Sequence, residues 1–146
     1  MHELEKLKKI ICIKDNDEDD RMLLHEALLT MDQPFEIQEF SSAEQLMELC
    51  GKPDHRSDYI FLDLLMLGMD GFKCITELRR LRGAVGKIII YTIDSKKESM
   101  EKAFLLGADF YAVKPHTFED LKDMTALIMQ GGWENLQQVQ RIFHIL

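Results

Sequence analysis

The chain contains no long hydrophobic run, and this absence argues against a membrane-embedded protein. No apolar segment approaches the roughly 20 residues that cross a bilayer as a helix. Residues 1–9 are rich in charge and lack the apolar core and small-residue cleavage site of a secretory signal peptide. We therefore expect no membrane partner and no secretion.

Cysteine is scarce as well. The three cysteines, Cys12, Cys50 and Cys74, are odd in number and widely spaced. That pattern suits reduced thiols, because disulfide frameworks and zinc sites use closely grouped or evenly paired cysteines. The five histidines show no ligand spacing either. We expect a cytoplasmic protein without a disulfide frame or a zinc site.

Positively charged residues are also fewer than negatively charged ones. Lys and Arg number 18 against 26 Asp and Glu, which gives a formal net charge of −8. An acidic surface repels phosphate backbones, so we expect no nucleic-acid partner. The length of 146 residues, with 46% hydrophobic and 30% charged residues, fits one soluble domain with a modest remainder.

What the chain does have is a regular alternation of short apolar runs with segments of helical spacing. The expected strands cover residues 10–13, 35–40, 59–62, 88–91 and 110–113. The second run alternates apolar and polar residues, which favours a sheet edge, whereas the others are continuous and favour burial on both faces. Five β–α units in series predict an α/β fold, a doubly wound parallel sheet with helices on both faces.

Capping residues predict where the helices begin and end. Ser42 and Ser95 each open a capping box, in which a serine is followed three residues later by Gln or Glu. Thr117 is expected to cap the last of the five helices. Gly107 is expected to end the fourth helix, and the glycine pair 131–132 the fifth.

Polar residues follow four of the predicted strands. The first strand leads into the acidic turn 15–20, the third into Asp63, the fourth into Thr92 and the fifth into Lys114. Ligands of such sheets bind outside the carboxyl ends of the strands. Carboxylates, a hydroxyl and an amine should therefore converge on one crevice.

The acidic turn excludes a phosphate held directly by backbone N–H groups, because carboxylates would repel it unless a cation lay between them. Oxygen-rich clusters of this kind suit Mg²⁺. We assign Asp15 and Asn16, at the strand end, to a metal. Asp19 and Asp20 are interpreted as N-capping carboxylates that complement the dipole of the first helix.

Asp63 and Lys114 each allow two interpretations. Asp63 lies in an apolar setting and can be a nucleophile toward phosphorus, or a loop aspartate; Asp70 fits the role of turn and cap residue better. Pro115 restricts Lys114 and permits a cis bond, so a rigid turn could aim the ammonium over the sheet. The alternative for Lys114 is an ordinary surface lysine.

In this order and at these spacings, the residues resemble a bacterial response-regulator receiver domain, from about Lys8 to Gln130. The matching pieces are the acidic turn, Asp63 with the sequence GMDGF at 68–72, Thr92 after IIIY, LGAD at 106–109 and Lys114-Pro115. The resemblance implies a flavodoxin-like receiver fold with strand order 2-1-3-4-5, and we assign residues 1–130 to it.

The resemblance also implies a role for each site residue. Asp63 resembles the phosphoacceptor, which takes a phosphoryl group from a phosphohistidine on a histidine kinase or phosphotransfer protein. A Mg²⁺ cofactor would be held by Asp15, Asn16, Asp63 and the backbone carbonyl of Leu65, with Asp17 as a possible extra member of the metal shell.

Three further residues take their roles from the same resemblance. Lys114 would neutralise charge on the phosphoryl oxygens during transfer. Thr92 resembles the switch hydroxyl that binds the phosphoryl group, and Tyr111 the aromatic residue that rotates inward after it. Tyr111 could equally be a plain edge-strand aromatic residue.

Several positions depart from the family pattern. Asn16 stands where the second of two adjacent carboxylates is usual, and Lys14 replaces an apolar residue just before the pair. A one-residue insertion would instead put Lys14 and Asp15 in the pair. Either alignment loses one formal charge and predicts weak Mg²⁺ binding. Leu65 and Ile93 are bulky and apolar, and they are expected to restrict water near Asp63.

Residues 131–146 form a predicted amphipathic helical extension. Their apolar stripe consists of Leu136, Val139, Phe143 and Leu146. The segment is too short for a DNA-binding output domain of about 50 residues. We therefore expect a stand-alone regulator that signals to an unknown downstream protein. The stripe would pack on its own domain or form a homodimer.

Two other functions stay open. One is a Mg²⁺-dependent phosphohydrolase, which is disfavoured because Leu65 replaces the second carboxylate that such enzymes use. The other is a receiver-like interaction module that is never phosphorylated, which Lys14, Asn16 and Ile93 favour. The leading prediction is a phosphoacceptor that catalyses its own phosphotransfer and loses the phosphoryl group slowly, and not a conventional enzyme.

Overall fold

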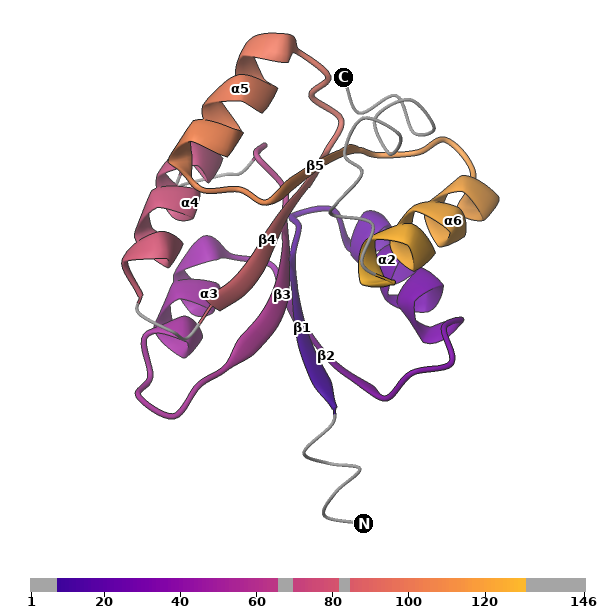
Figure 1. Ribbon diagram of the computed structural model, residues 1–146, viewed down its shortest axis with the longest axis horizontal. Coiled ribbons are helices and arrows are strands. Elements are labelled where there is room, and N and C mark those ends of the chain that lie inside the picture. Colours follow the sequence, from indigo (N-terminus) through magenta and orange to yellow (C-terminus); the bar gives the residue numbers. More distant parts are fainter. Residues whose placement is uncertain (1–7, 66–69, 82–84, 131–146) are drawn as a thin grey trace.

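The computed structural model describes residues 8–65, 70–81 and 85–130. Strands and helices alternate along the chain (Figure 1). They are β1 (Lys9–Lys14), α2 (Glu18–Leu29), β2 (Phe35–Phe40), α3 (Ala43–Cys50), β3 (Ser57–Leu62), α4 (Gly71–Arg80), β4 (Val85–Thr92), α5 (Lys97–Leu106), β5 (Phe110–Val113) and α6 (Phe118–Met129). Three of the strands are longer than predicted, because backbone pairing continues past the apolar residues that mark them.

The five strands form one parallel sheet in the order β2-β1-β3-β4-β5, as predicted. Helices α2 and α6 pack together on one face, and α3, α4 and α5 cover the other (Figure 1). Because β2 lies at an edge, Glu36 and Glu39 stay exposed, which explains its alternating sequence. The fold class is therefore confirmed.

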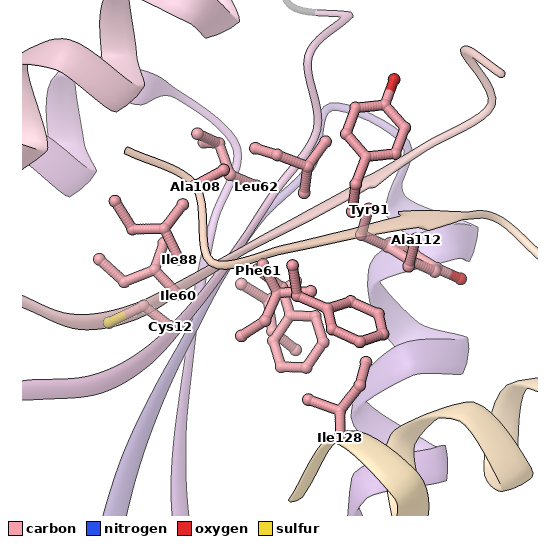
Figure 2. Packing of buried hydrophobic residues seen from close by; sticks show 14 of the residues in the cluster. Cys12, Ile60, Phe61, Leu62, Ile88, Tyr91, Ala108, Ala112 and Ile128 are labelled. Carbon is pink, nitrogen blue, oxygen red and sulfur yellow. The ribbon is translucent and has the colours of Figure 1, made fainter. Parts of the chain in front are cut away.

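The core lies on both faces of the three central strands. Ile60 and Phe61 of β3 are fully buried and point to opposite faces, as residues one apart on a strand must. Figure 2 shows Phe61 on the side of Ile128 from α6, and Ile60 beside Ile88 on the other side. Burial on both faces is why these strands have continuous apolar sequences. The sheet is thus a rigid platform that fixes the strand ends.

Two of the predicted hydroxyl N-caps, and the glycine predicted to end α5, are confirmed. The side chains of Ser42 and Thr117 accept hydrogen bonds from the backbone N–H groups of Gln45 and Asp120. Gly107 ends α5 in the left-handed conformation with φ of 119°. A Cβ atom at Gly107 would approach Arg79 Cγ to 2.7 Å, so both its φ and the space around it favour glycine.

The predicted capping box at Ser95 is wrong. Helix α5 begins at Lys97, and its N-cap residue, Lys96, makes no side-chain capping hydrogen bond. Asp94 supplies the polar contacts instead: its carboxylate accepts hydrogen bonds from Lys96 N at 2.9 Å and from Ser99 Oγ at 2.7 Å. Asp94, just upstream of Ser95, takes the capping role because its two carboxylate oxygens accept hydrogen bonds from two donors at once.

Other expectations concerned a cis peptide bond, the cysteine thiols and membrane-spanning helices. All described peptide bonds are trans, so the cis bond that Pro115 permits is not used. The thiols of Cys12, Cys50 and Cys74 are free and buried. No helix in the described part of the chain is long and apolar enough to span a membrane. The predicted extension at 131–146 lies outside the described residues.

Candidate functional site

Three aspartates meet at one lysine beyond the carboxyl ends of the strands. Lys114 Nζ lies 3.0 Å from Asp63 Oδ2, 2.8 Å from Asp15 Oδ2 and 2.7 Å from Asp20 Oδ2. Asp15 follows β1, Asp63 follows β3 and Lys114 follows β5. The sheet therefore brings together the residues that the sequence placed at its strand ends.

Strand pairing explains why these side chains can meet. The Asp63 N–H donates to the carbonyl of Lys14, at the end of β1, at 3.1 Å. The Lys114 N–H donates to the Thr92 carbonyl at 2.8 Å, which fixes the end of β5 against β4. Pro115 follows immediately and cannot extend the ladder, because it has no N–H. Lys114 is thereby held at the point where its side chain turns back over the sheet.

The charges of the cluster oppose the cost of burial at Lys114. Burial by itself would lower the Lys114 pKa, but the nearby Asp15, Asp20 and Asp63 carboxylates raise it above its ordinary value. At Asp15 the balance is reversed. Burial raises the Asp15 pKa, even though Lys114 and the Asp17 N–H act to lower it. Asp15 Oδ2 is within ion-pair distance of Lys114 but lacks an aligned hydrogen bond.

Asp20 is the site residue that the sequence interpretation missed. We predicted Asp19 and Asp20 as N-caps, but the N-cap of α2 is Asp17, whose Oδ1 accepts from their backbone N–H groups at 2.9 and 3.1 Å. The Asp20 side chain is thus free to reach Lys114. A signal was present: Asp20 lies four residues before the buried Leu24, on the side of α2 that faces the sheet.

Asp63 is held by both carboxylate oxygens. Oδ1 accepts a hydrogen bond from the Leu65 N–H at 3.0 Å, and Oδ2 faces Lys114. Asp63 is only 6% exposed, whereas Leu65 is half exposed, so the carboxylate lies just beneath the surface. Asp70, by contrast, accepts a hydrogen bond from the Phe72 N–H and caps α4, as predicted.

Thr92 and Tyr111 meet at the loop after β4. Thr92 Oγ1 accepts a hydrogen bond from the Asp94 N–H at 3.3 Å, and the Tyr111 hydroxyl donates to the Asp94 carbonyl at 2.7 Å. Both side chains are fully buried. Burial raises the Tyr111 pKa, with Asp94 and Asp63 acting in the same direction, so its hydroxyl stays protonated as a donor. Ile93, between Thr92 and Asp94, is largely exposed.

The predicted magnesium ligands are arranged differently from a metal site. Lys14, the last residue of β1, donates from Nζ to Asn16 Oδ1 at 2.7 Å, so the amide oxygen already has a cationic partner. The three carboxylates gather around Lys114. Within the described residues, no group of three His, Cys, Asp or Glu side chains is arranged to hold a metal. As they stand, the donors do not fit Mg²⁺.

A comparison with protein families decides the identity of the fold. The model of the response regulator receiver domain matches residues 11–126 of this chain. The chain belongs to the response regulator receiver family. The receiver prediction is thereby confirmed, and with it the assignment to two-component signalling.

Curated relatives agree with the family assignment. The nitrate/nitrite response regulator protein NarL of Escherichia coli is 35% identical over 85 residues, covering 58% of this chain and 38% of NarL. The transcriptional regulatory protein MalR of Bacillus subtilis is 33% identical over 105 residues, covering 70% of this chain and 43% of MalR. This chain therefore matches less than half the length of either relative.

Solved structures show the same fold. The Mn²⁺-bound form of the response regulator Rcp1 superposes with a TM-score of 0.72 at 20% identity, covering 87% of this chain and 96% of that one. The BeF3-activated receiver domain of DrrB gives a TM-score of 0.67 at 21% identity, covering 84% and 98%. At these identities the likeness concerns the fold alone.

Proposed function

We propose that this receiver accepts a phosphoryl group on Asp63 from a phosphohistidine of a histidine kinase or phosphotransfer protein. One observation carries the proposal: the Asp63 carboxylate ends β3 just beneath the surface, with its Oδ2 3.0 Å from the Lys114 ammonium. A carboxylate nucleophile needs such a cation, because the phosphoryl group brings further negative charge to the same place.

Phosphoryl transfer to Asp63 is a substitution at phosphorus. An Asp63 carboxylate oxygen forms a bond to phosphorus as the bond from phosphorus to the imidazole nitrogen breaks. The electron pair of that bond returns to the imidazole nitrogen, which takes up a proton from water, so the histidine leaves as neutral imidazole. Lys114 then exchanges its contact with Asp63 for one with a phosphoryl oxygen. Its raised pKa keeps it positively charged at neutral pH, so the charge is available throughout.

Thr92 and Tyr111 are suited to report the phosphorylated state. In our proposal the Thr92 hydroxyl turns to the phosphoryl group and gives up its hydrogen bond with the Asp94 N–H. Tyr111 stays buried and holds the Asp94 carbonyl. A change at phosphorus would therefore move the loop after β4, whose outer face carries the exposed Ile93. A protein partner would read that surface.

Several wider properties remain proposals. We propose a cytoplasmic regulator that acts through an unknown downstream protein, with no nucleic acid or membrane as partner. The homodimer built on the 131–146 stripe is also a proposal. Support comes from the sequence alone: its net charge of −8 disfavours a nucleic-acid partner.

We propose that this chain binds Mg²⁺ only weakly. Rcp1 has been crystallised with Mn²⁺, and receiver domains generally bind Mg²⁺. In this chain the amide of Asn16 brings no charge and accepts a hydrogen bond from Lys14. That contact also favours a second candidate function, an interaction module that is never phosphorylated.

Phosphorylation with acetyl phosphate and Mg²⁺, followed by intact mass measurement, tests the proposal. Wild type should gain one phosphoryl group and Asp63→Asn none. Asp70→Asn is the matched control: it lies seven residues further on, caps α4 through a hydrogen bond that asparagine also makes, and should label like wild type. Equal labelling of Asp63→Asn would mean that another residue is the phosphoacceptor, whereas no labelling of wild type would favour the interaction module.

A further inference from the structure

Lys14 is a buried cation that the proposed reaction does not use. Its side chain is 1% exposed, although lysine is almost never buried without a partner. The Lys14 ammonium donates to Asn16 Oδ1 at 2.7 Å. It also attracts the charges of Asp15 and Asp63, which partly offset the cost of its burial.

Burying the charge of a lysine at this position costs free energy, which favours a functional role for that charge. The preceding residues Ile11, Cys12 and Ile13 are all buried and apolar, and an apolar residue at 14 would continue the pattern. The strand brings the ammonium to the pocket instead. Its hydrogen bond engages the amide oxygen of Asn16, which was predicted as a metal ligand.

The charge balance of the pocket fits this placement. Asp15, Asp20 and Asp63 contribute three carboxylates, and Lys114 and Lys14 contribute two ammonium groups. With Lys114 alone, the three carboxylates would leave a formal charge of −2, and Lys14 reduces it to −1. Here the second positive charge is part of the chain, and a divalent ion would have to approach against it.

We propose that the Lys14 ammonium takes the place of a divalent metal ion, so that this pocket binds a phosphoryl group or a phosphoryl mimic at Asp63 without one. The inference rests on the proposed function for its consequence, but its physical basis is the contact of Lys14 with Asn16. Lys114 and Lys14 approach the pocket from β5 and β1, and together they supply the positive charge.

Mg²⁺ titration by calorimetry tests the inference without any phosphorylation. Lys14→Met removes the charge but keeps a long, unbranched, apolar side chain in the buried strand. It should bind Mg²⁺ at least about tenfold more tightly than wild type, because the repulsion is gone and Asn16 Oδ1 is free. Lys14→Arg keeps the charge and should stay as weak as wild type. Equal Mg²⁺ affinity in wild type and Lys14→Met would overturn the inference.

Labelling by acetyl phosphate, with Mg²⁺ or with EDTA, tests the consequence. Wild type and Lys14→Arg should label at similar rates in both conditions, whereas EDTA should slow Lys14→Met by about tenfold or more. Lys97→Met, an exposed lysine of α5, should behave like wild type. Loss of wild-type labelling in EDTA would overturn the inference.

The two proposals fail in different ways. If Asp63→Asn labels as wild type does, the phosphoacceptor proposal fails while calorimetry still decides the role of Lys14. Thermal melting of each variant shows whether it is folded. If Lys14→Met is unfolded, Lys14→Gln replaces it with the same expectations, because glutamine is also neutral and unbranched.

Discussion

The Tyr111 hydroxyl donates a 2.7 Å hydrogen bond to the backbone carbonyl of Asp94, across the gap between β5 and the loop after β4. The ring of Tyr111 is fully buried, so the hydroxyl could not turn to water if this contact were lost. Thr92 binds the N–H of the same Asp94. Thr92 and Tyr111, the two residues predicted as the switch, thus both bind the backbone of Asp94, which links the pocket to the loop.

We expect Tyr111→Phe to lose about 1 kcal/mol of unfolding free energy, because the Asp94 carbonyl loses its donor while the ring still fills its space. Urea unfolding measures the loss. Tyr91→Phe is the matched control, since the Tyr91 ring is also buried but its hydroxyl has no hydrogen-bond partner among the described residues. Equal losses in the two variants would show that the Tyr111 contact contributes nothing specific.

Arg79 provides a second prediction, one that concerns stability alone. Its guanidinium donates to the Gly107 carbonyl at 2.8 Å, to the Gly86 carbonyl at 2.9 Å and to Asp109, whose carboxylate also accepts from the Ile88 N–H. One side chain thus holds the end of α5 to the start of β4.

Arg79→Met should lower the unfolding free energy by about 1–3 kcal/mol, because two carbonyls and a carboxylate lose a charged donor. Arg80→Met is the control: Arg80 is mostly exposed, its ion pair with Glu77 spans 3.5 Å, and the change should stay within about 0.5 kcal/mol. Chemical denaturation measures both variants. A loss at Arg80 as large as that at Arg79 would contradict this account.

The buried carboxyl group of Asp15 should make the free energy of unfolding depend on pH. Burial raises its folded pKa above the unfolded value, so the folded state binds more protons than the unfolded state between the two pKa values. The Asp15 contribution to stability is therefore fully present below the ordinary carboxyl pKa of about 3.9 and is lost as the pH rises through the raised folded pKa. Burial of the charged form then costs stability at neutral pH.

Asp15→Asn removes this dependence. The unfolding free energy of the variant minus that of wild type should become more positive as the pH rises through that window. Denaturant titrations at a series of pH values measure the difference, with Asp70→Asn, at an exposed helix cap, as the control. A difference that stays flat would mean that Lys114 fully offsets burial at Asp15, and a difference that falls with pH would mean that Lys114 outweighs it.

Much of this fold could be predicted because it depends on patterns that are local in the sequence. Continuous apolar runs marked β1, β3 and β4 because both faces of those strands are buried. The edge position of β2 showed in its alternation. Asp63 and Lys114 could be placed at one crevice because parallel strands end at the same edge of the sheet.

The misses share a different cause, the choice between competing hydrogen-bond partners. Asp17 and Asp94 took the capping contacts that we assigned to their neighbours, and this released Asp20 to join Lys114. Lys14 could be singled out as unusual, but not its contact with Asn16. Such outcomes depend on side-chain directions that residue type and spacing do not fix.

The last prediction concerns how long a phosphorylated Asp63 would survive. Hydrolysis needs a water molecule in line with phosphorus, opposite the carboxylate oxygen. Leu65, two residues after Asp63, and Ile93, next to Thr92, are both exposed and apolar, and neither can hold such a water by hydrogen bonds. We expect each side chain to raise the activation free energy of hydrolysis by about 1 kcal/mol, which slows the reaction roughly fivefold. A long-lived phosphorylated state suits slow regulation better than fast relay.

Decay of purified phosphoprotein, followed by intact mass, measures this lifetime. Leu65→Asn should shorten it by supplying a polar group that orients water, and Ile93→Ala should shorten it by opening the approach. Leu105→Asn is the control, because Leu105 is the most exposed large apolar side chain among the described residues and lies in α5, away from the strand ends. Rates of phosphorylation are measured on the same variants, since Ile93 also crowds the incoming donor. If both substitutions leave decay unchanged while the control behaves like wild type, water access at these two side chains does not set the lifetime, and the charges of Lys14 and Lys114 become the groups to vary next.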